Sequence, residues 1–512
     1  MKKKHSDRLI WKKDGYVTLF ACLLFLVMTG AIFLCLDGIV IHQGEGKSKM
    51  AEIGAGEHLL ANYNVPLAKR YHVYFLDPQM EGKLESRAKT YYKESFSPTS
   101  SAFLRTGFLL KLAVKNVEVT GFGTMQEQNC LYFRHQIREY MKYDSSKEIL
   151  ANIIDQATKQ MNQQNQEIRD MKQLIGQKEE SISKEQNDSS SQTPPNLAEE
   201  KGQKETALSA QKQDPRKEIH KIIKNGVLEF VTDGEVISDQ KMIPDHLPSG
   251  SRKEKNKTIS GNLFSSLSSM KELFHEFQWE KGANNLSDEI FTYAYIRKYF
   301  NSYKKEENIE DTYMDYEMEY LLGGRLSDKE NLEYTVNRLI LTRFAFDFLY
   351  AAKDPELNSK ALSLAVTLVG ATGITPLVEG VKYMILGAVS FGEALLDVRN
   401  LIEGRKVPLL KTKSDWNFSW NGTGGLDSHG KNESKKGLSY EEYLILLLTL
   451  RTNRNLLYLR MEDLMQVNIM QEQPGFLIEN CRFGFSMKTQ LQIQTWFGHG
   501  IYPIDHERTF SY

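Results

Sequence analysis

The sequence has few cysteines. Of its four cysteines, Cys22 and Cys35 lie in one apolar run, and only Cys130 and Cys481 lie elsewhere. Those two are compatible with one disulfide in an oxidising compartment, but two thiols so distant in sequence are more often unpaired buried side chains. No zinc-type cysteine spacing occurs, which excludes a zinc ribbon or zinc finger.

An excess of positive charge is also missing. The chain has 65 Lys and Arg against 66 Asp and Glu, a formal net charge of -1 and a pI near 6.9. Nucleic-acid-binding domains usually carry a basic surface, so no nucleic-acid partner is predicted. The mean hydropathy of -0.45 indicates a mostly water-facing chain, and 512 residues leave room for more than one domain.

The sequence lacks the patterns of common catalytic and metal sites. It contains no HExxH and no GxSxG. Gly44 to Ser48 ends like a phosphate-binding loop, but Ile41 stands where that pattern needs a glycine. His499 and His506 lie beside acidic residues, which is more typical of a solvated loop than of a metal site. No catalytic residue, cofactor, metal ligand or small-molecule substrate is predicted, and the sequence favours a protein that is not an enzyme.

One long apolar run stands out. Tyr16 to Leu36, YVTLFACLLFLVMTGAIFLCL, has no Asp, Glu, Lys, Arg or His. A helix over 16–36 would span about 31 Å, which matches the hydrocarbon core of a bilayer. We therefore predict a transmembrane helix with membrane lipid as partner. Its predicted anchor residues are Tyr16, Leu19, Phe20, Leu23, Leu24, Leu26, Phe33 and Leu36. A cleaved secretory signal is less favoured, because its apolar region is shorter and ends at a small-x-small site, which is missing after Phe33.

The charges on either side of this run predict its orientation. Six basic residues precede it, namely Lys2, Lys3, Lys4, Arg8, Lys12 and Lys13, whereas Asp37 is the first charge after it. Basic flanks tend to remain in the cytoplasm. Residues 1–15 are therefore predicted to be a cytoplasmic basic segment of a single-pass cell-membrane protein, with the C-terminal domain extracytoplasmic.

Residues 37–64 are predicted to form a membrane-proximal helical stalk. Its five glycines, Gly38, Gly44, Gly46, Gly54 and Gly56, each cost about 1 kcal/mol relative to Ala inside a helix. We expect the stalk to be kinked or frayed.

Two segments follow before the main helical region. Residues 65–144 are predicted to be α+β, with a bulged strand over 109–119 and an amphipathic helix over 131–143. Residues 145–217 are predicted to be a polar helix and a disordered insertion, the latter over 187–214. Apolar residues recur every seven positions in the helix, at Met161, Ile168, Ile175 and Ile182. This spacing permits a coiled coil, but polar companion positions favour a solvated helix that packs weakly.

Residues 218–512 are predicted to be mainly helical with C-terminal strands. Helices are expected near 263–277, 286–303, 328–353, 357–370, 376–403 and 439–471, and a short strand near 227–231. Alternation over 475–497 predicts two strands of a hairpin that pairs with 109–119. The fold class is therefore α+β, mostly helical with a small antiparallel sheet from early and C-terminal strands.

Two further features leave alternatives open. The uncharged stretch 361–378 could be a second membrane span, but Gly370, Gly373 and Pro376 favour a buried helical hairpin. Tyrosines cluster at Tyr91 and Tyr92 and again at Tyr313, Tyr316 and Tyr320, which suits either an interface or core packing. Asp311, Asp315, Glu317 and Glu319 are expected on a solvated acidic face.

Several segments of the chain together resemble a known group of proteins. They are Gly15 to Phe20, Leu59 to Asn64, Tyr71 to Asp77, Asp315 to Gly324, Glu393 to Arg399, Lys406 to Thr412 and Gly437 to Tyr443. The chain resembles the TadE/TadG-like proteins of tight-adherence pilus systems. It is more closely similar to a related family of gram-positive bacterial membrane proteins known mainly as a domain of unknown function. The resemblance covers most of the chain except about residues 150–220.

The resemblance implies a minor pilin-like or assembly protein that is anchored by its N-terminal helix. Its implied partners are pilin-like or pilus assembly proteins. Gly15 and Tyr16 are a candidate processing site for a prepilin peptidase, but Phe20 stands where such precursors carry a Glu. The alternatives are a membrane-tethered cell-envelope hydrolase, which would need a cleft with convergent acidic or histidine residues, and a ligand-binding domain.

Overall fold

The computed structural model describes residues 14–80, 82–96, 111–188, 214–243, 245–250, 259, 263–276, 286–305, 308–369, 375–419, 437–450, 453–497 and 500–512. Most of the basic segment and of the predicted insertion over 187–214 lies outside these residues, as does His499. The chain divides into two compact units. Unit 1 comprises residues 1–133 and 476–512, and unit 2 comprises residues 134–475.

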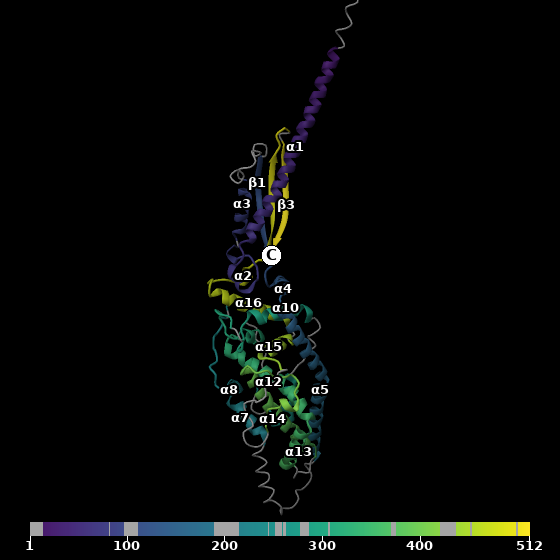
Figure 1. Ribbon diagram of the computed structural model, residues 1–512, viewed down its shortest axis with the longest axis vertical. Coiled ribbons are helices and arrows are strands. Elements are labelled where there is room, and N and C mark those ends of the chain that lie inside the picture. Colours follow the sequence, from purple (N-terminus) through teal and green to yellow (C-terminus); the bar gives the residue numbers. More distant parts are fainter. Residues whose placement is uncertain are drawn as a thin grey trace, which may run out of the picture. The chain divides into compact units, whose positions relative to one another are not determined.

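Unit 1 contains one long helix, a small sheet and several short helices (Figure 1). The elements are α1 (Asp14–Leu60), α2 (Val65–Tyr71), η1 (Pro78–Met80), α3 (Leu84–Glu94), β1 (Lys111–Phe122), the start of α4 (Glu127–Met141), η8 (Ile478–Asn480), β2 (Gly484–Gln494) and β3 (Ile501–Ser511). The early strand and the two C-terminal strands meet in one sheet, as the sequence predicted.

The sheet is antiparallel with the order β1-β2-β3. Leu112 pairs with Ile493, and the register shifts between Val114 and Asn116. The bulge predicted for the first strand is therefore confirmed. One face of the sheet is apolar and packs on α1 and α3. This core includes Ala51, Ala55, Leu59, Ala88, Tyr92, Val117, Phe485, Met487, Leu491 and Ile493.

The position of the hairpin differs from the prediction. A single strand, β2, covers most of the alternating region, and its hairpin partner is β3. The apolar residues Phe485, Met487, Leu491 and Ile493 are all at odd positions, so they lie on one face of one strand. The predicted pair of strands within 475–497 is wrong for this reason.

The expected kink in the stalk is also wrong. α1 is a continuous helix of 47 residues. The part after Leu36 packs on the sheet, and this burial offsets the low helix propensity of its glycines. Gly56 lets the helix approach the sheet closely, because an added Cβ would lie 2.3 Å from the Phe510 ring.

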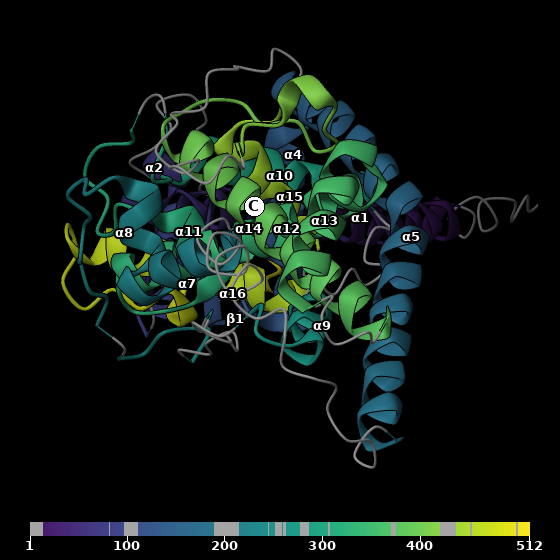
Figure 2. The same ribbon diagram turned by 90° about the horizontal axis from the view of Figure 1, so that it is seen from below.

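Unit 2 is helical (Figures 1 and 2). Its elements are the rest of α4, α5 (Ser146–Asp188), α7 (Pro215–Asn225), α8 (Val227–Thr232), α9 (Leu267–Glu276), α10 (Leu286–Tyr299), α11 (Glu317–Gly323), α12 (Asp328–Lys353), α13 (Pro355–Val369), α14 (Thr375–Ile402), η7 (Lys413–Asp415), α15 (Tyr440–Thr449) and α16 (Arg454–Met470). The helices α12 and α14 pack along each other and form most of the core.

The polar helix α5 is packed more firmly than expected. Its residues Met161, Ile168 and Ile175 are buried, and the helix contacts α9, α10 and α14. Figure 2 shows α5 along the flank of unit 2. The seven-residue spacing therefore marks the face of a helix that packs on a globular core, and the prediction of weak packing is wrong.

Other boundaries in unit 2 also need correction. Residues 227–231 belong to a helix, α8, whose buried Val227 and Val231 lie four positions apart, as on one helical face. The long helix expected over 439–471 is divided into α15 and α16, and Asn453 caps the start of the second. The uncharged stretch 361–378 falls on α13 and α14. In α13, Ala361 and Ala365 are buried, whereas Leu362 and Val366 are exposed.

Candidate functional site

The apolar first half of α1 is exposed along its whole length. The predicted anchor residues Tyr16, Leu19, Phe20, Leu23, Leu24, Leu26, Phe33 and Leu36 have relative exposures between 40% and 76%. Within the described part of the chain, α1 is the one helix that is long and apolar enough to cross a membrane. The chain therefore has an N-terminal helix suited to a single-pass anchor. Tyr16 of the candidate processing site lies in its first turn.

The apolar run ends at a contact with the β2–β3 hairpin. Asp37 is buried, and its Oδ1 accepts hydrogen bonds from the backbone N–H groups of Trp496 and Phe497, at 3.0 and 3.2 Å. One turn earlier, the Phe33 ring stacks on the Phe497 ring, with centroids 4.2 Å apart. The first charged residue after the run is thus held by the sheet.

The second half of α1 carries a polar seam against the sheet. The Ser48 and Tyr92 hydroxyl oxygens lie 2.8 Å apart. Glu52 is buried, and one of its carboxylate oxygens lies 3.8 Å from Nε of Arg508. Burial raises the pKa of Glu52, although Arg508 opposes the shift.

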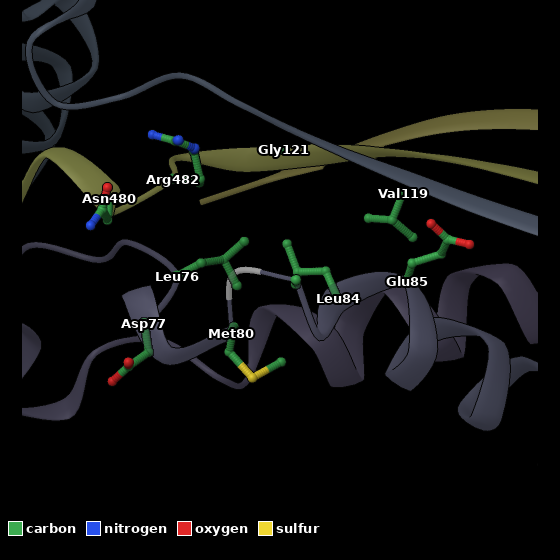
Figure 3. Close-up of a pocket in the computed structure, with 10 residues that line it drawn as sticks. Leu76, Asp77, Met80, Leu84, Glu85, Val119, Gly121, Asn480 and Arg482 are labelled. Carbon is green, nitrogen blue, oxygen red and sulfur yellow. The ribbon is translucent and has the colours of Figure 1, made fainter.

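A small groove lies beside β1 in unit 1 (Figure 3). It has a volume of about 300 Å³ and is lined by Leu76, Asp77, Met80, Gly82, Leu84, Glu85, Val119, Gly121, Asn480 and Arg482. Figure 3 shows Leu76, Leu84 and Val119 around the groove and Asp77 turned away from them. The Asp77 carboxylate already accepts hydrogen bonds from the Gln79 N–H and the Asn64 side chain. Among the described residues that line the groove, no Ser, Thr, Cys or His is present.

Unit 2 contains a buried network of two cations and three carboxylates. Arg343 on α12 donates to Asp347 at 2.6 Å and to Asp397 at 2.8 Å. Lys411 donates to Asp397 at 2.6 Å and also pairs with Glu393. All five side chains are at most 1% exposed. Burial raises the pKa of Asp347 and of Glu393.

This network holds a loop rather than a ligand. Arg343 also donates to the backbone oxygens of Pro408 and Leu409, at 2.9 and 2.8 Å. Glu393 accepts from the N–H groups of Asn417 and Phe418. Buried backbone groups outside a helix or sheet need such partners. The charged side chains of α12 and α14 thus fasten the irregular segment 408–418 to the helical core.

The acidic residues of α11 have the same kind of role. Glu317 and Glu319 are fully buried, which contradicts the expected solvated acidic face. Glu317 accepts from the Asn301 N–H at 2.8 Å, and Glu319 accepts from the Tyr303 N–H at 3.0 Å. Asp311 has a left-handed backbone and precedes the helix, so it shares no helical face with these residues.

The environment of Glu319 shifts its ionisation. Its Oε1 also accepts from the Tyr440 hydroxyl at 2.7 Å, whereas its Oε2 is buried without a hydrogen-bond partner. Burial raises the pKa of Glu319 to about 7. Burial likewise raises the pKa of Asp328, which accepts from the N–H groups of Asp315 and Tyr316, to about 6.

A buried arginine binds the backbone oxygens at the C-terminal end of α11. Arg460 on α16 donates to the backbone oxygens of Leu321 and Leu322, both at 2.9 Å. Gly324 follows with a φ of +65°, and an added Cβ would lie 2.2 Å from Nη2 of Arg460. A side chain at this position would therefore displace the guanidinium group.

A cavity of about 580 Å³ in unit 2 is lined by more basic than acidic residues. Its charged residues are Arg297, Lys298, Lys304, Lys305, Lys406, Glu441 and Glu442. Three of these cations lie within 4 Å of a carboxylate, because Arg297 faces Glu441, Lys298 faces Asp144 and Lys304 faces Glu235. These carboxylates offset most of the positive charge.

Other candidates from the sequence are accounted for by packing. Tyr92, Tyr316 and Tyr320 are buried, as core packing requires. Cys130 and Cys481 are buried thiols. His506 lies on β3, where burial lowers its pKa. Among the described side chains, no group of three or more His, Cys, Asp or Glu residues is arranged to hold a metal ion.

The buried networks involve the segments that carry the resemblance. Asp315 to Gly324, Glu393 to Arg399, Lys406 to Thr412 and Gly437 to Tyr443 all contribute hydrogen-bonding or capping residues to them. Sequence patterns gave no sign of this role, because most partners of these charges are backbone groups or side chains of other segments of the chain.

A model of a family of unknown function, DUF5702, matches residues 204–493. No curated protein and no solved structure matches the chain. The match confirms the resemblance to a domain of unknown function, whereas the link to tight-adherence systems stays a prediction. Helix α1 and strand β1 lie outside the matched residues.

Proposed function

Since this chain belongs to DUF5702, a family of unknown function, we propose its role from its own geometry: a membrane-anchored, non-enzymatic component of a tight-adherence type pilus assembly or surface apparatus. It acts through contacts with other proteins, such as pilin-like subunits. In this proposal α1 spans the cell membrane with its N-terminus in the cytoplasm, and the remaining chain is extracytoplasmic.

The two-part helix α1 is the observation that carries the proposal. Its first half exposes large apolar side chains on all sides, whereas its second half is packed on the sheet of unit 1. An apolar surface of this size is unfavourable in water and needs a cover of lipid or of neighbouring helices. A helix of this kind can hold the protein in a membrane and can also pack it among similar helices, with no covalent chemistry.

The buried carboxylates support a non-enzymatic role over a tethered hydrolase. Asp347, Glu393 and Asp397 converge in unit 2, but each of them binds a cation, and they are closed off from solvent. A hydrolytic acid pair has to reach its substrate, for which these groups are badly placed. A ligand-binding role gains no specific support from the groove or from the basic cavity.

Membrane attachment is tested by placing charge in α1. Replacing Leu23 and Leu26 with Arg costs about 2.5 to 3.5 kcal/mol per residue at the centre of a membrane helix, so the double variant should leave the membrane fraction. Ile149→Arg is the matched control, because Ile149 is an exposed apolar residue of α5 outside the anchor. Wild-type protein that is washed off membranes by carbonate would contradict the proposal.

The association with other subunits is tested in the anchor itself. A photo-crosslinking residue in place of Leu34, which is 75% exposed, should trap other membrane proteins with pilin-like helices. Mass spectrometry of the mature N-terminus then separates a subunit that is cleaved after Gly15 from a static anchor. A crosslinker that traps no protein at this position would contradict a role in assembly.

A further inference from the structure

Exposed aromatic and apolar side chains lie where β2 ends and β3 begins. Trp496 and Phe497 follow β2, and Ile501 and Tyr502 begin β3. We call these four residues the aromatic tip. Phe497, Ile501 and Tyr502 are 43%, 64% and 42% exposed. Exposed apolar groups that gather at one point usually mark a contact surface.

The stretch of sequence around the tip is free of acidic and of Lys or Arg side chains. Residues 489–504 include no Asp, Glu, Lys or Arg, although such residues make up 26% of the chain. Along the chain, the nearest charged residues are Lys488 on β2 and Asp505 on β3. In space, the Asp37 carboxylate of α1 lies against the tip, and Lys111 of β1 pairs with Gln494. The ends of β2 and β3 next to the tip thus carry no Asp, Glu, Lys or Arg, whereas the rest of β3 carries Asp505, Glu507 and Arg508.

Contacts with α1 place the tip at the end of the apolar run. Phe497 stacks on Phe33, and the Asp37 carboxylate accepts hydrogen bonds from the backbone N–H groups of Trp496 and Phe497. Figure 1 shows β2 and β3 running beside α1, with the end of β2 and the start of β3 toward the apolar part of the helix. The polar seam of Glu52 and Arg508 and the contact of Gly56 with Phe510 lie further along the same helix.

The level of these contacts on α1 matches the edge of a bilayer. If residues 16–36 fill the hydrocarbon core, Asp37 lies at its boundary and Phe33 lies about 6 Å inside it. The ring stacked on Phe33 then reaches the same depth. Trp and Tyr side chains are enriched in this interfacial layer because their rings are apolar and their N–H or O–H groups are polar.

We propose that the aromatic tip inserts into the interfacial layer of the membrane that holds α1, as a second lipid contact of the protein. This inference rests on the proposed membrane anchorage. The partner is the boundary between lipid headgroups and acyl chains. The hairpin also screens Asp37 there, because two backbone N–H groups bind its carboxylate where water is scarce.

The test uses the full-length protein in vesicles that contain nitroxide-labelled lipids. A fluorophore is attached to a single cysteine at Phe497, in a background where Cys22, Cys35, Cys130 and Cys481 are replaced by Ala. Shallow nitroxides should quench this label about twofold or more, because interfacial groups lie within 5 to 10 Å of the headgroup boundary. A label at Glu507→Cys, on β3 and further from the tip, is the matched control and should remain unquenched.

A third label at Leu26→Cys separates this inference from the anchorage. If deep nitroxides quench the label at position 26 but shallow ones leave position 497 unquenched, the tip contact is overturned and the anchor stands. If position 26 is unquenched, the anchorage itself fails. A label at position 497 that is shielded from aqueous iodide but unquenched by lipid nitroxides indicates a protein contact and also overturns the proposal.

A second measurement needs no substitution. Hydroxyl-radical footprinting of the native protein in vesicles should oxidise Tyr502 several-fold more slowly than Tyr143, beyond the roughly twofold difference in their exposures of 42% and 87%. Oxidation of Tyr502 in proportion to its exposure would overturn the inference even if the cysteine-free variant does not fold.

Discussion

Unit 2 buries many charged side chains, whereas unit 1 buries few. Among the described residues, unit 1 buries the carboxylates of Asp37 and Glu52. Unit 2 buries Asp214, Glu289, Glu317, Glu319, Asp328, Arg343, Asp347, Glu393, Asp397, Arg399, Arg460, Glu462 and Asp463. The core of unit 1 consists of a helix packed on a sheet. The backbone N–H and C=O groups of both elements form hydrogen bonds with one another inside the helix and the sheet. Unit 2 has irregular segments inside its core, and charged side chains supply the hydrogen bonds that these segments need.

The two units therefore depend on different interactions. In unit 1, stability comes mainly from the fit of α1 against the sheet. In unit 2, part of the stability comes from networks of buried charges. Each charge there needs its partners, because an uncompensated buried charge is costly. Substitutions that leave a charge alone should harm unit 2 most, and substitutions that alter shape should harm unit 1.

The largest effect is expected for Arg343→Met. This change leaves Asp347 and Asp397 without the guanidinium group and the Pro408 and Leu409 oxygens without a donor. Removing one partner of a buried ion pair typically costs about 3 to 5 kcal/mol in the free energy of unfolding. Denaturant unfolding, combined with hydrogen exchange of residues 408–418, measures the loss.

The control for this change is Lys353→Met. Lys353 pairs with Glu167 at 2.5 Å, but the two side chains are 58% and 39% exposed. A surface pair of this kind contributes at most about 1 kcal/mol. Equal losses of unfolding free energy in the two variants would show that the buried network of unit 2 stabilises the protein no more than a surface ion pair does.

The next effect is a pH dependence of unit 2 that arises from Glu319. Its pKa is about 7 in the folded protein, above the ordinary value of 4.5, because the side chain is buried. The folded state thus keeps a proton that the unfolded state releases. The contribution of Glu319 to the free energy of unfolding is fully present below about pH 4.5. About 3 kcal/mol of it is lost as the pH rises from there through 7. Denaturant unfolding between pH 4 and 8 should show this fall.

Glu319→Gln should flatten that profile. The amide keeps an acceptor for the Tyr303 N–H and places its NH₂ group where the carboxyl proton would lie, so ionisation is abolished with little change of shape. The exposed Glu330→Gln is the control and should leave the slope unchanged. Asp328, whose pKa is about 6 because of burial, should account for the slope that remains. An unchanged slope in Glu319→Gln would contradict the assignment.

These networks also mark the limit of prediction from the sequence. The span 16–36, the bulged strand near 114 and the long helices α12 and α14 follow from local patterns of apolar residues. The buried roles of Glu317, Arg343 and Asp397 do not, since a charged residue on a helix looks solvated until its distant partners are known. The continuous stalk was missed for a related reason. The cost of its glycines is local, whereas the strands β2 and β3, on which this part of α1 packs, lie more than 400 residues away in sequence.

The fit of α1 in unit 1 is tested by Gly56→Val. The added side chain would overlap the Phe510 ring, and overpacking of a core typically costs about 1 to 3 kcal/mol. Gly54→Val is the matched control on the same helix, because nothing lies within 4 Å of a Cβ added there. Unfolding of unit 1, followed by hydrogen exchange of β2 and β3, should show a loss for position 56 alone. Equal behaviour of the two variants would contradict the close approach.

The smallest effect is expected for Ser48→Ala in the polar seam of unit 1. It removes the buried contact with the Tyr92 hydroxyl, at a cost of about 1 kcal/mol that the higher helix propensity of Ala partly offsets. Tyr92→Phe removes the other partner, so a double-mutant cycle isolates the coupling between them. The double variant should be less destabilised than the sum of the single ones, because neither hydroxyl of the Ser48–Tyr92 pair is then left buried without the other. A Ser48–Tyr92 coupling energy as large as the loss of unfolding free energy in Arg343→Met would contradict the difference between the units. Neutral hydroxyls in unit 1 would then contribute as much to stability as buried charges in unit 2.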